Sequence, residues 1–216
     1  MWKKIGIAVG AALVVLVIAI SLQPGEFKIQ RSRKVMAPPG VVYLFVQDFH
    51  RWSVWSPWEK LDPNLKREYS GAKSGTGAVY DWVGNNQAGQ GRMTIEKATN
   101  SREVQIKLEF IKPFAATNQT VFLFEKNGEA TVVTWTMTGK NSFMGKAFSL
   151  LMDMDELVGK DFEKGLEGLK RAAEGEVKRQ VTEQAAREAD LSRALLADQA
   201  ARSAAADKAA AAASAR

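Results

Sequence analysis

Residues 143–169 have the spacing of a long amphipathic helix, and this stretch constrains the fold more than any other part of the chain. Three glycines in its second half, Gly159, Gly165 and Gly168, interrupt its apolar pattern, and each costs a helix about 1 kcal/mol relative to alanine. Their presence indicates either close packing on a partner or a helix wall with space beside it. We expect a core helix packed on a sheet, with a ligand cavity as the sharper alternative. The apolar stripe recurs mostly at steps of three and four residues and consists of Phe148, Leu151, Met152, Val158, Phe162, Leu166 and Leu169.

The chain before this helix has the pattern of an antiparallel sheet. Alternating apolar residues predict a first strand over residues 27–35, and Pro38-Pro39 then opens a short helix. Six further strands are predicted over residues 66–70, 78–83, 92–98, 103–110, 117–125 and 130–138. Asn127-Gly128 predicts a type I′ hairpin between the last two. The order of elements predicts an α+β fold in which a curved antiparallel sheet wraps around the C-terminal helix, with two short helices after the first strand. Because a bent sheet diverges from a straight helix, a cavity can remain between them.

Three tryptophans lie close together in the segment between the first strand and the rest of the sheet. Trp52, Trp55 and Trp58 are spaced by three, and Pro57 prevents a long helix there. Indoles bury a large apolar area and carry one N–H that needs an acceptor. The segment is therefore interpreted as a compact corner of the core, with an aromatic mouth for an apolar ligand as the alternative.

Residues 5–22 form an uncharged apolar run of eighteen residues. A helix of about 20 residues spans the apolar core of a bilayer. Trp2, Lys3 and Lys4 have the character of an interfacial anchor, which favours a single-pass membrane protein. The alternative is a cleaved signal peptide, because Ala19-Ile20-Ser21 resembles a small-x-small cleavage site.

The basic charge of the chain is concentrated beside this apolar run. Residues 1–34 hold six Lys or Arg residues against Glu26, so the excess favours a membrane surface over nucleic acid as the anionic partner. Lys3 and Lys4 favour an extracytoplasmic domain. The basic residues between Lys28 and Lys34 favour the cytoplasmic face instead, and a strand there would reduce their weight.

The sequence offers little for catalysis or metal binding. It has no cysteine and one histidine, His50, so we expect no metal site and no cofactor. Asp153 and Asp155 are two apart on a helix and cannot share a proton, whereas Asp153 and Glu156 could be neighbours. Asp48 lies two residues from His50, which is weak support for acid–base chemistry. No catalytic residues are nominated, and the chain is interpreted as a binding protein rather than an enzyme.

The last part of the chain is alanine-rich with evenly mixed charges. Its composition favours a solvated helix or a disordered extension, and a helix that binds a protein partner is the alternative. We therefore divide the chain into an anchor or signal over residues 1–23, a globular domain over residues 24–173 and a tail over residues 174–216.

Several motifs along the globular domain resemble those of a known family. The sequence is similar, over about residues 26–172, to the SRPBCC superfamily (START/Bet v 1-like, helix-grip fold), and in particular to its polyketide cyclase/dehydrase and lipid transport proteins. The motifs are Ala37-Pro38-Pro39, Trp52-x-x-Trp55-Ser-Pro-Trp58, Leu61-Asp62-Pro63, Ser74-Gly75-x-Gly77-Ala-x-Tyr80-x-Trp82, Gly91-x-Met93, Phe110-x-Lys112-Pro113-Phe114, Val133-Thr-Trp135-x-Met137-x-Gly139 and Gly159-x-Asp161-Phe-Glu-Lys-Gly165.

The resemblance implies a deep apolar pocket between the sheet and the C-terminal helix. We expect this pocket to hold a lipid or another hydrophobic small molecule in a membrane-tethered carrier domain. A polyketide cyclase or dehydratase using the same pocket is one alternative, and a non-catalytic scaffold protein is another. The residues expected to line the pocket are Trp55, Trp58, Tyr80, Trp82, Met93, Phe110, Phe114, Trp135, Leu151, Met152, Asp155 and Phe162.

Overall fold

A single seven-stranded antiparallel sheet organises the computed structural model, which describes residues 2–150 and 153–214. The strand order is β1-β7-β6-β5-β4-β3-β2, so the first strand pairs with the last. The strands are β1 (Glu26–Val35), β2 (Lys66–Gly71), β3 (Ala78–Val83), β4 (Gln90–Thr99), β5 (Glu103–Lys112), β6 (Ala116–Asn127) and β7 (Ala130–Lys140). The helices are α1 (Trp2–Ser21), α2 (Pro39–Val46), α3 (Trp52–Trp55), α4 (Phe143–Ser149) and α5 (Met154–Ser214), with the short 3₁₀ turns η1 (Phe49–Arg51) and η2 (Trp58–Lys60).

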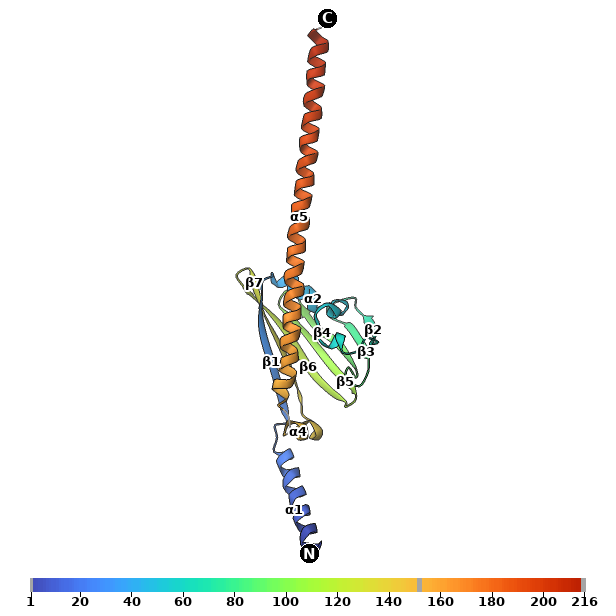
Figure 1. The fold of residues 1–216 in the computed structure, drawn as a ribbon, viewed down its shortest axis with the longest axis vertical. Helices are drawn as coiled ribbons and strands as arrows, with labels where there is room; N and C mark the ends of the chain where they lie inside the picture. Colours follow the sequence, from blue (N-terminus) through green and yellow to red (C-terminus); the bar gives the residue numbers. More distant parts are fainter. Residues whose placement is uncertain (1, 151–152, 215–216) are drawn as a thin grey trace. The chain divides into compact units, whose positions relative to one another are not determined.

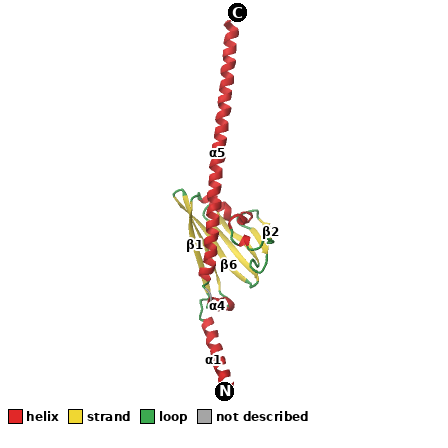
Figure 2. Cartoon of the chain, viewed as in Figure 1, coloured by secondary structure: helices red, strands yellow, loops and turns green. Residues whose placement is uncertain are grey.

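The sheet curves around the first part of α5, as the sequence predicts (Figure 1). Figure 2 shows the helix crossing one face of the strands. The side of α5 that faces the sheet carries Phe162, Leu166, Leu169 and Ala173, each at most 2% exposed. Because these residues follow one another at helical spacing, burying them fixes which side of α5 faces the sheet. The predicted α+β helix-grip fold is confirmed.

The helix predicted over residues 143–169 is wrong in one respect, because the structure has two helices there. α4 ends at Ser149 and α5 begins at Met154. The Asp153 side chain accepts a hydrogen bond from the backbone N–H of Glu156 at 3.0 Å, which is the geometry of an N-cap. Asp153 and Glu156 also have the spacing of a capping box, so the sequence carries the signal for a new helix start.

The hairpin at residues 127–130 is present, but its predicted turn type is wrong. Asn127 pairs with Ala130, so Gly128 and Glu129 are the central residues. Gly128 has a φ of 64°, and Glu129 is not among the residues with positive φ. A type I′ turn needs positive φ at both central residues. The central residues are Gly128 and Glu129 rather than Asn127 and Gly128, and Glu129 does not have the positive φ that this turn type requires.

The N-terminal helix α1 is long and apolar enough, by its length and composition, to cross a membrane. A signal sequence would meet the same criterion. At its C-terminal end α1 contacts α4, where the Lys146 ammonium donates to the backbone carbonyl of Ser21 at 3.2 Å.

The described chain separates into two compact units, residues 1–174 and residues 175–216. The sheet, α1 to α4 and the start of α5 belong to the first unit. The second unit is helical as far as Ser214, and its ion pairs are between residues three or four apart, such as Arg202 with Asp198.

Candidate functional site

Five aromatic side chains meet where α5 crosses the sheet, and we call them the Trp135 cluster: Trp55, Trp58, Phe122, Trp135 and Phe162. The Trp135 ring stacks on Phe162 of α5, with centroids 4.1 Å apart, and lies 4.6 Å from Phe122 of the neighbouring strand. Trp55 and Trp58 contact it edge-on at 5.7 and 5.5 Å. At this level the protein's own rings fill the space between sheet and helix.

Two of the glycines in the predicted helix explain how α5 comes so close to these rings. A Cβ at Gly165 would lie 2.8 Å from Trp135 Cζ3, and one at Gly168 would lie 2.4 Å from the backbone oxygen of Trp55. No side chain fits at either distance without movement. Close packing is therefore the reason for both glycines, rather than space beside the helix.

The indole N–H of Trp135 is buried without an acceptor among the described residues. The side chains of Trp52 and Trp55 donate instead to the backbone carbonyls of Val46 and Phe45, each at 2.9 Å. A buried polar group without a partner costs about 1–3 kcal/mol. Trp135 thus places one unused hydrogen-bond donor within an otherwise apolar cluster.

A second group of expected lining residues lies on the same face, farther from β1. Tyr80 and Trp82 of β3 have ring centroids 6.1 Å apart, and Trp82 contacts Phe110 of β5 at 6.0 Å. Met93 of β4 pairs in register with Tyr80 and is buried. These four residues form a wall of aromatic and thioether groups beside the Trp135 cluster.

The remaining expected lining residues are not brought into either group. Phe114 lies in the β5–β6 turn and is largely exposed. Asp155 lies in the first turn of α5 and pairs with Arg31. Leu151 and Met152 lie outside the described residues.

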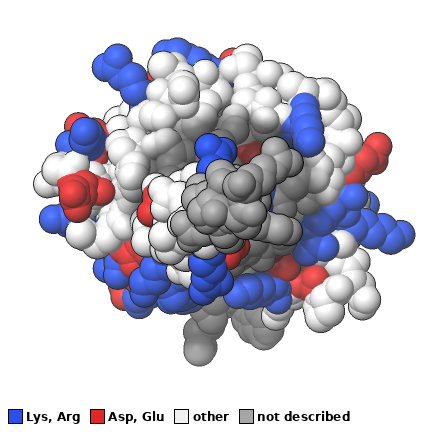
Figure 3. Space-filling view, turned by 90° about the horizontal axis from the view of Figure 1, so that it is seen from above, with Lys and Arg blue, Asp and Glu red and all other residues white. Residues whose placement is uncertain are grey.

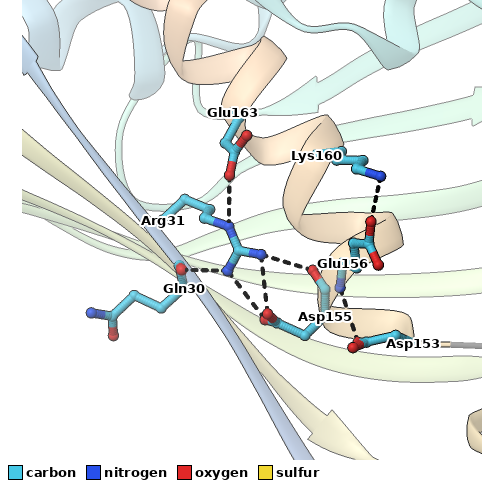
Figure 4. Close-up of polar contacts among 7 residues, drawn as sticks. All are labelled: Gln30, Arg31, Asp153, Asp155, Glu156, Lys160 and Glu163. Carbon is cyan, nitrogen blue, oxygen red and sulfur yellow. Dashed lines mark hydrogen bonds and ion pairs between the residues drawn. The ribbon is translucent and has the colours of Figure 1, made fainter.

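Arg31 fastens the beginning of α5 to β1 (Figure 4). Its guanidinium donates to the Asp155 carboxylate at 3.0 and 3.2 Å, to the Asp155 backbone carbonyl at 2.9 Å and to Glu163 at 3.0 Å. A Cβ at Gly159 would lie 1.9 Å from Arg31 Nη2, so the third glycine makes room for the guanidinium. The hydrogen bond to Asp155, together with the other contacts, raises the pKa of Arg31.

A second ion pair extends this contact along the same two elements. Arg33 pairs with Glu167 at 2.9 Å, one helical turn beyond Glu163. Arg31 and Arg33 therefore serve the packing of α5, although the sequence groups them with a basic membrane-facing segment. Lys28 and Lys34 are the exposed remainder of that segment.

A polar cluster at the edge of the aromatic face involves Glu59, which the sequence analysis did not single out. Its carboxylate accepts from the Tyr80 hydroxyl at 2.6 Å and from Arg67 Nε at 2.7 Å. Burial, and then the bond to Glu59, raises the pKa of Tyr80 well above its ordinary value. Tyr80 thus remains a donor, and both oxygens of Glu59 are engaged. No local pattern pairs Glu59 with Tyr80, which lies 21 residues away.

Two of the pockets that the described residues form lie at the surface of the first unit, and the Trp135 cluster lines neither of them. One, of about 120 Å³, is lined by residues of β2, β3 and the start of η1, including His50 and Tyr69. There His50 Nδ1 lies 2.9 Å from an Asp48 oxygen and the imidazole stacks on Tyr69 at 4.1 Å. The other, of about 680 Å³, is lined mainly by polar residues of β4, β5 and β6.

Charges of both signs are interspersed over the face seen in Figure 3. Among residues 2–150 and 153–214, no group of three or more His, Asp or Glu side chains could hold a metal ion. The site is therefore characterised by aromatic packing, one unused donor and a clamped helix start.

A comparison with protein families gives one match that covers most of the chain. The family described as polyketide cyclase/dehydrase and lipid transport matches residues 26–174. No curated protein matches the sequence.

Solved structures share the fold of the matched region. Protein CV1439 of Chromobacterium violaceum has a TM-score of 0.51 and 12% identity, covering 68% of this chain and 96% of that one. TTHA0849 of Thermus thermophilus has a TM-score of 0.50 and 19% identity, with 68% and 97% covered. MLL2253 of Mesorhizobium loti has a TM-score of 0.51 and 11% identity, with 68% and 96% covered. At such identities the likeness shows the fold alone.

Proposed function

The chain belongs to the polyketide cyclase/dehydrase and lipid transport family, and from this premise we propose that it is a membrane-tethered domain that binds a hydrophobic small molecule. The ligand is a lipid or a molecule of similar apolarity, held between the sheet and the first turns of α5. The helix-grip domain comprises residues 24–173, and residues 174–216 are an appended tail.

The observation that carries this proposal is the unpartnered indole N–H of Trp135. A carbonyl or hydroxyl oxygen on an otherwise apolar ligand would satisfy that donor, while the hydrocarbon part of the ligand would lie against neighbouring apolar side chains. Met93 and Met137, both buried on the same face, suit this role because a thioether side chain adapts its shape at low cost.

Binding requires the beginning of α5 to move, because rings occupy the space beside Trp135. Arg31 is the side chain that clamps the first turns of α5 to β1, through Asp155 and Glu163. We expect the bound state to form when these turns separate from the sheet and the aromatic rings rotate. The contacts farther along α5, around Leu166 and Leu169, stay in place.

The tether is α1, and we propose that the domain lies outside the cytoplasm. Lys3 and Lys4 precede the apolar run of α1, whereas the basic residues after it, from Lys28 to Lys34, belong to the folded strand β1 and are expected to weigh less in setting the orientation. A reporter fused after residue 216 should be active only outside the cytoplasm, and activity inside would reverse this assignment.

The binding proposal is tested by photo-crosslinking the full-length protein in vesicles with a fatty acid that carries a diazirine. We expect adducts on α1 from the bilayer and separate adducts on β7 and on residues 154–166 of α5. Adducts confined to α1 would contradict ligand binding by the domain.

Two matched variants test the part played by the indole. Trp135→Phe keeps a ring in the cluster and removes the N–H donor. One hydrogen bond to the ligand contributes about 0.5–1.5 kcal/mol to the binding free energy, so we expect the yield of domain adducts to fall by up to about tenfold. Trp52→Phe removes an indole outside the cluster, whose N–H already donates to the backbone carbonyl of Val46, and should leave the yield near that of the unmodified protein. Adducts on α1 give the internal reference, and equal yields from both variants would refute the role of Trp135.

A further inference from the structure

The two ends of the sheet differ in the side chains that they expose. β1 begins and β7 ends beside α1, and the antiparallel register places the β5–β6 turn at this same end, which we call the α1 edge. At the opposite edge the larger pocket is lined by charged side chains that include Arg102, Glu125 and Lys126.

Large apolar side chains gather at the α1 edge, and we call this set the apolar rim. Their exposed fractions lie between 39% and 79%, although water is a poor solvent for all of them. They come from three segments that are distant in the sequence: the residue after α1, the end of β5 with the β5–β6 turn, and α4 with the residue after it. The rim consists of Leu22, Ile111, Phe114, Phe143 and Leu150.

The chain connecting α1 to the sheet is short and folded back, which keeps the rim near a bilayer that α1 crosses. The N–H groups of Leu22 and Gln23 donate to the carbonyls of Ile18 and Ile20, so the connection is not extended. Residues 22–25 separate the end of α1 from the start of β1, and four extended residues reach at most about 14 Å. The headgroup layer on each side of a bilayer is about 5–8 Å thick. The connection is also fastened, because Asn141 donates to the carbonyls of Pro24 at 3.1 Å and Gly25 at 2.9 Å.

We propose that the apolar rim is a second membrane contact, which dips into the interfacial layer of the leaflet from which α1 emerges. This inference rests on the tethering in the proposed function and adds the surface by which the domain is oriented on the bilayer. Lys112 and Lys140 flank the rim and can reach headgroup phosphates, while the carboxylates of Glu26 and Asp153 at the same edge limit the net positive charge. The attraction is therefore mainly apolar.

The absence of cysteine from the sequence permits a direct test with single-cysteine variants of the full-length protein. Phe114→Cys and Phe143→Cys place an environment-sensitive NBD fluorophore on the rim, and Leu123→Cys places it on the convex face by the polar pocket as a matched control. Each protein is reconstituted into vesicles of phosphatidylcholine and phosphatidylglycerol. Circular dichroism verifies that each variant is folded.

We expect a quencher attached to lipid acyl chains to reduce the emission of the two rim labels several-fold more than that of the control. If the labelled proteins float with the vesicles but iodide in the water quenches the rim labels as readily as the control label, the rim does not contact the membrane. That result would overturn the present inference and leave the tethering by α1 intact. Rim labels shielded from iodide and insensitive to the lipid quencher would indicate contact between copies of the chain, which also overturns the inference. Failure of the protein to float with vesicles would instead overturn the tethering itself.

Discussion

Gly168 shows how one missing side chain sets the distance between α5 and the segment that carries the tryptophans. A Cβ there would meet the backbone of Trp55, which cannot rotate away as the end of a flexible side chain could. Gly175, seven residues later in the same helix, has nothing within 4 Å of its ideal Cβ position. The two glycines therefore differ only in what surrounds them.

Gly168→Ala should destabilise the protein, whereas Gly175→Ala should not. Overpacking costs about 1–3 kcal/mol or more and exceeds the gain of about 1 kcal/mol in helix propensity. At about 2–4 °C per kcal/mol, the Tm of Gly168→Ala should fall by several degrees. The control should show an unchanged or higher Tm in the same thermal scan. Equal behaviour of the two variants would show that α5 is not tightly packed at Gly168.

At the scale of elements, ion pairs hold the beginning of α5 against β1. Arg31 makes this connection, because it binds two carboxylates about two helical turns apart, those of Asp155 and Glu163, together with a backbone carbonyl. Lys28, on the opposite face of β1, is exposed and takes part in no such contact with α5.

Arg31→Met should loosen the first turns of α5 without unfolding the domain. The change removes the ion pairs and retains an apolar chain of similar length, so backbone amides of residues 155–163 should exchange with deuterium several-fold faster. Lys28→Met removes a charge from the same strand and should leave exchange at these amides unchanged. Hydrogen exchange followed by mass spectrometry measures both, and unaltered exchange in Arg31→Met would show that other contacts clamp the helix.

Periodicity in the sequence accounts for the elements better than for the contacts between them. Alternation and helical spacing predict the strands and the buried face of α5, because each depends on residues close in sequence. The meeting of Trp55, Trp135 and Phe162 does not follow from such spacing, and they are grouped only through the pocket that the family resemblance implies. The pairing of Arg31 with Asp155 could not be predicted, since the partners are 124 residues apart and surface charges satisfy the same pattern equally well. The break before Met154 was predictable from its capping residues, but the apolar spacing on either side obscured it.

At the scale of the whole molecule, the buried side of α5 ends close to where the first compact unit ends. Leu169 and Ala173 are fully buried, and the Glu174 carboxylate accepts from the backbone N–H of Met36 at 2.8 Å. From residue 178 to residue 203 every described side chain is exposed. The helix thus continues well beyond Ala173, the last of its buried residues.

Deleting residues 175–216 should therefore leave the fold and stability of the first unit nearly intact. We expect the Tm to change by less than about 4 °C, which corresponds to about 1 kcal/mol for a chain of this size. Deletion from residue 167 onward is the matched control, because it also removes Leu169, whose loss alone should cost about 2–5 kcal/mol and lower the Tm by about 10 °C. Thermal unfolding followed by tryptophan fluorescence distinguishes the two, since the tryptophans all lie in the retained part. A large fall in Tm after deletion of residues 175–216 would contradict this expectation. It would mean that the second unit stabilises the first, and that its binding partner lies within this chain.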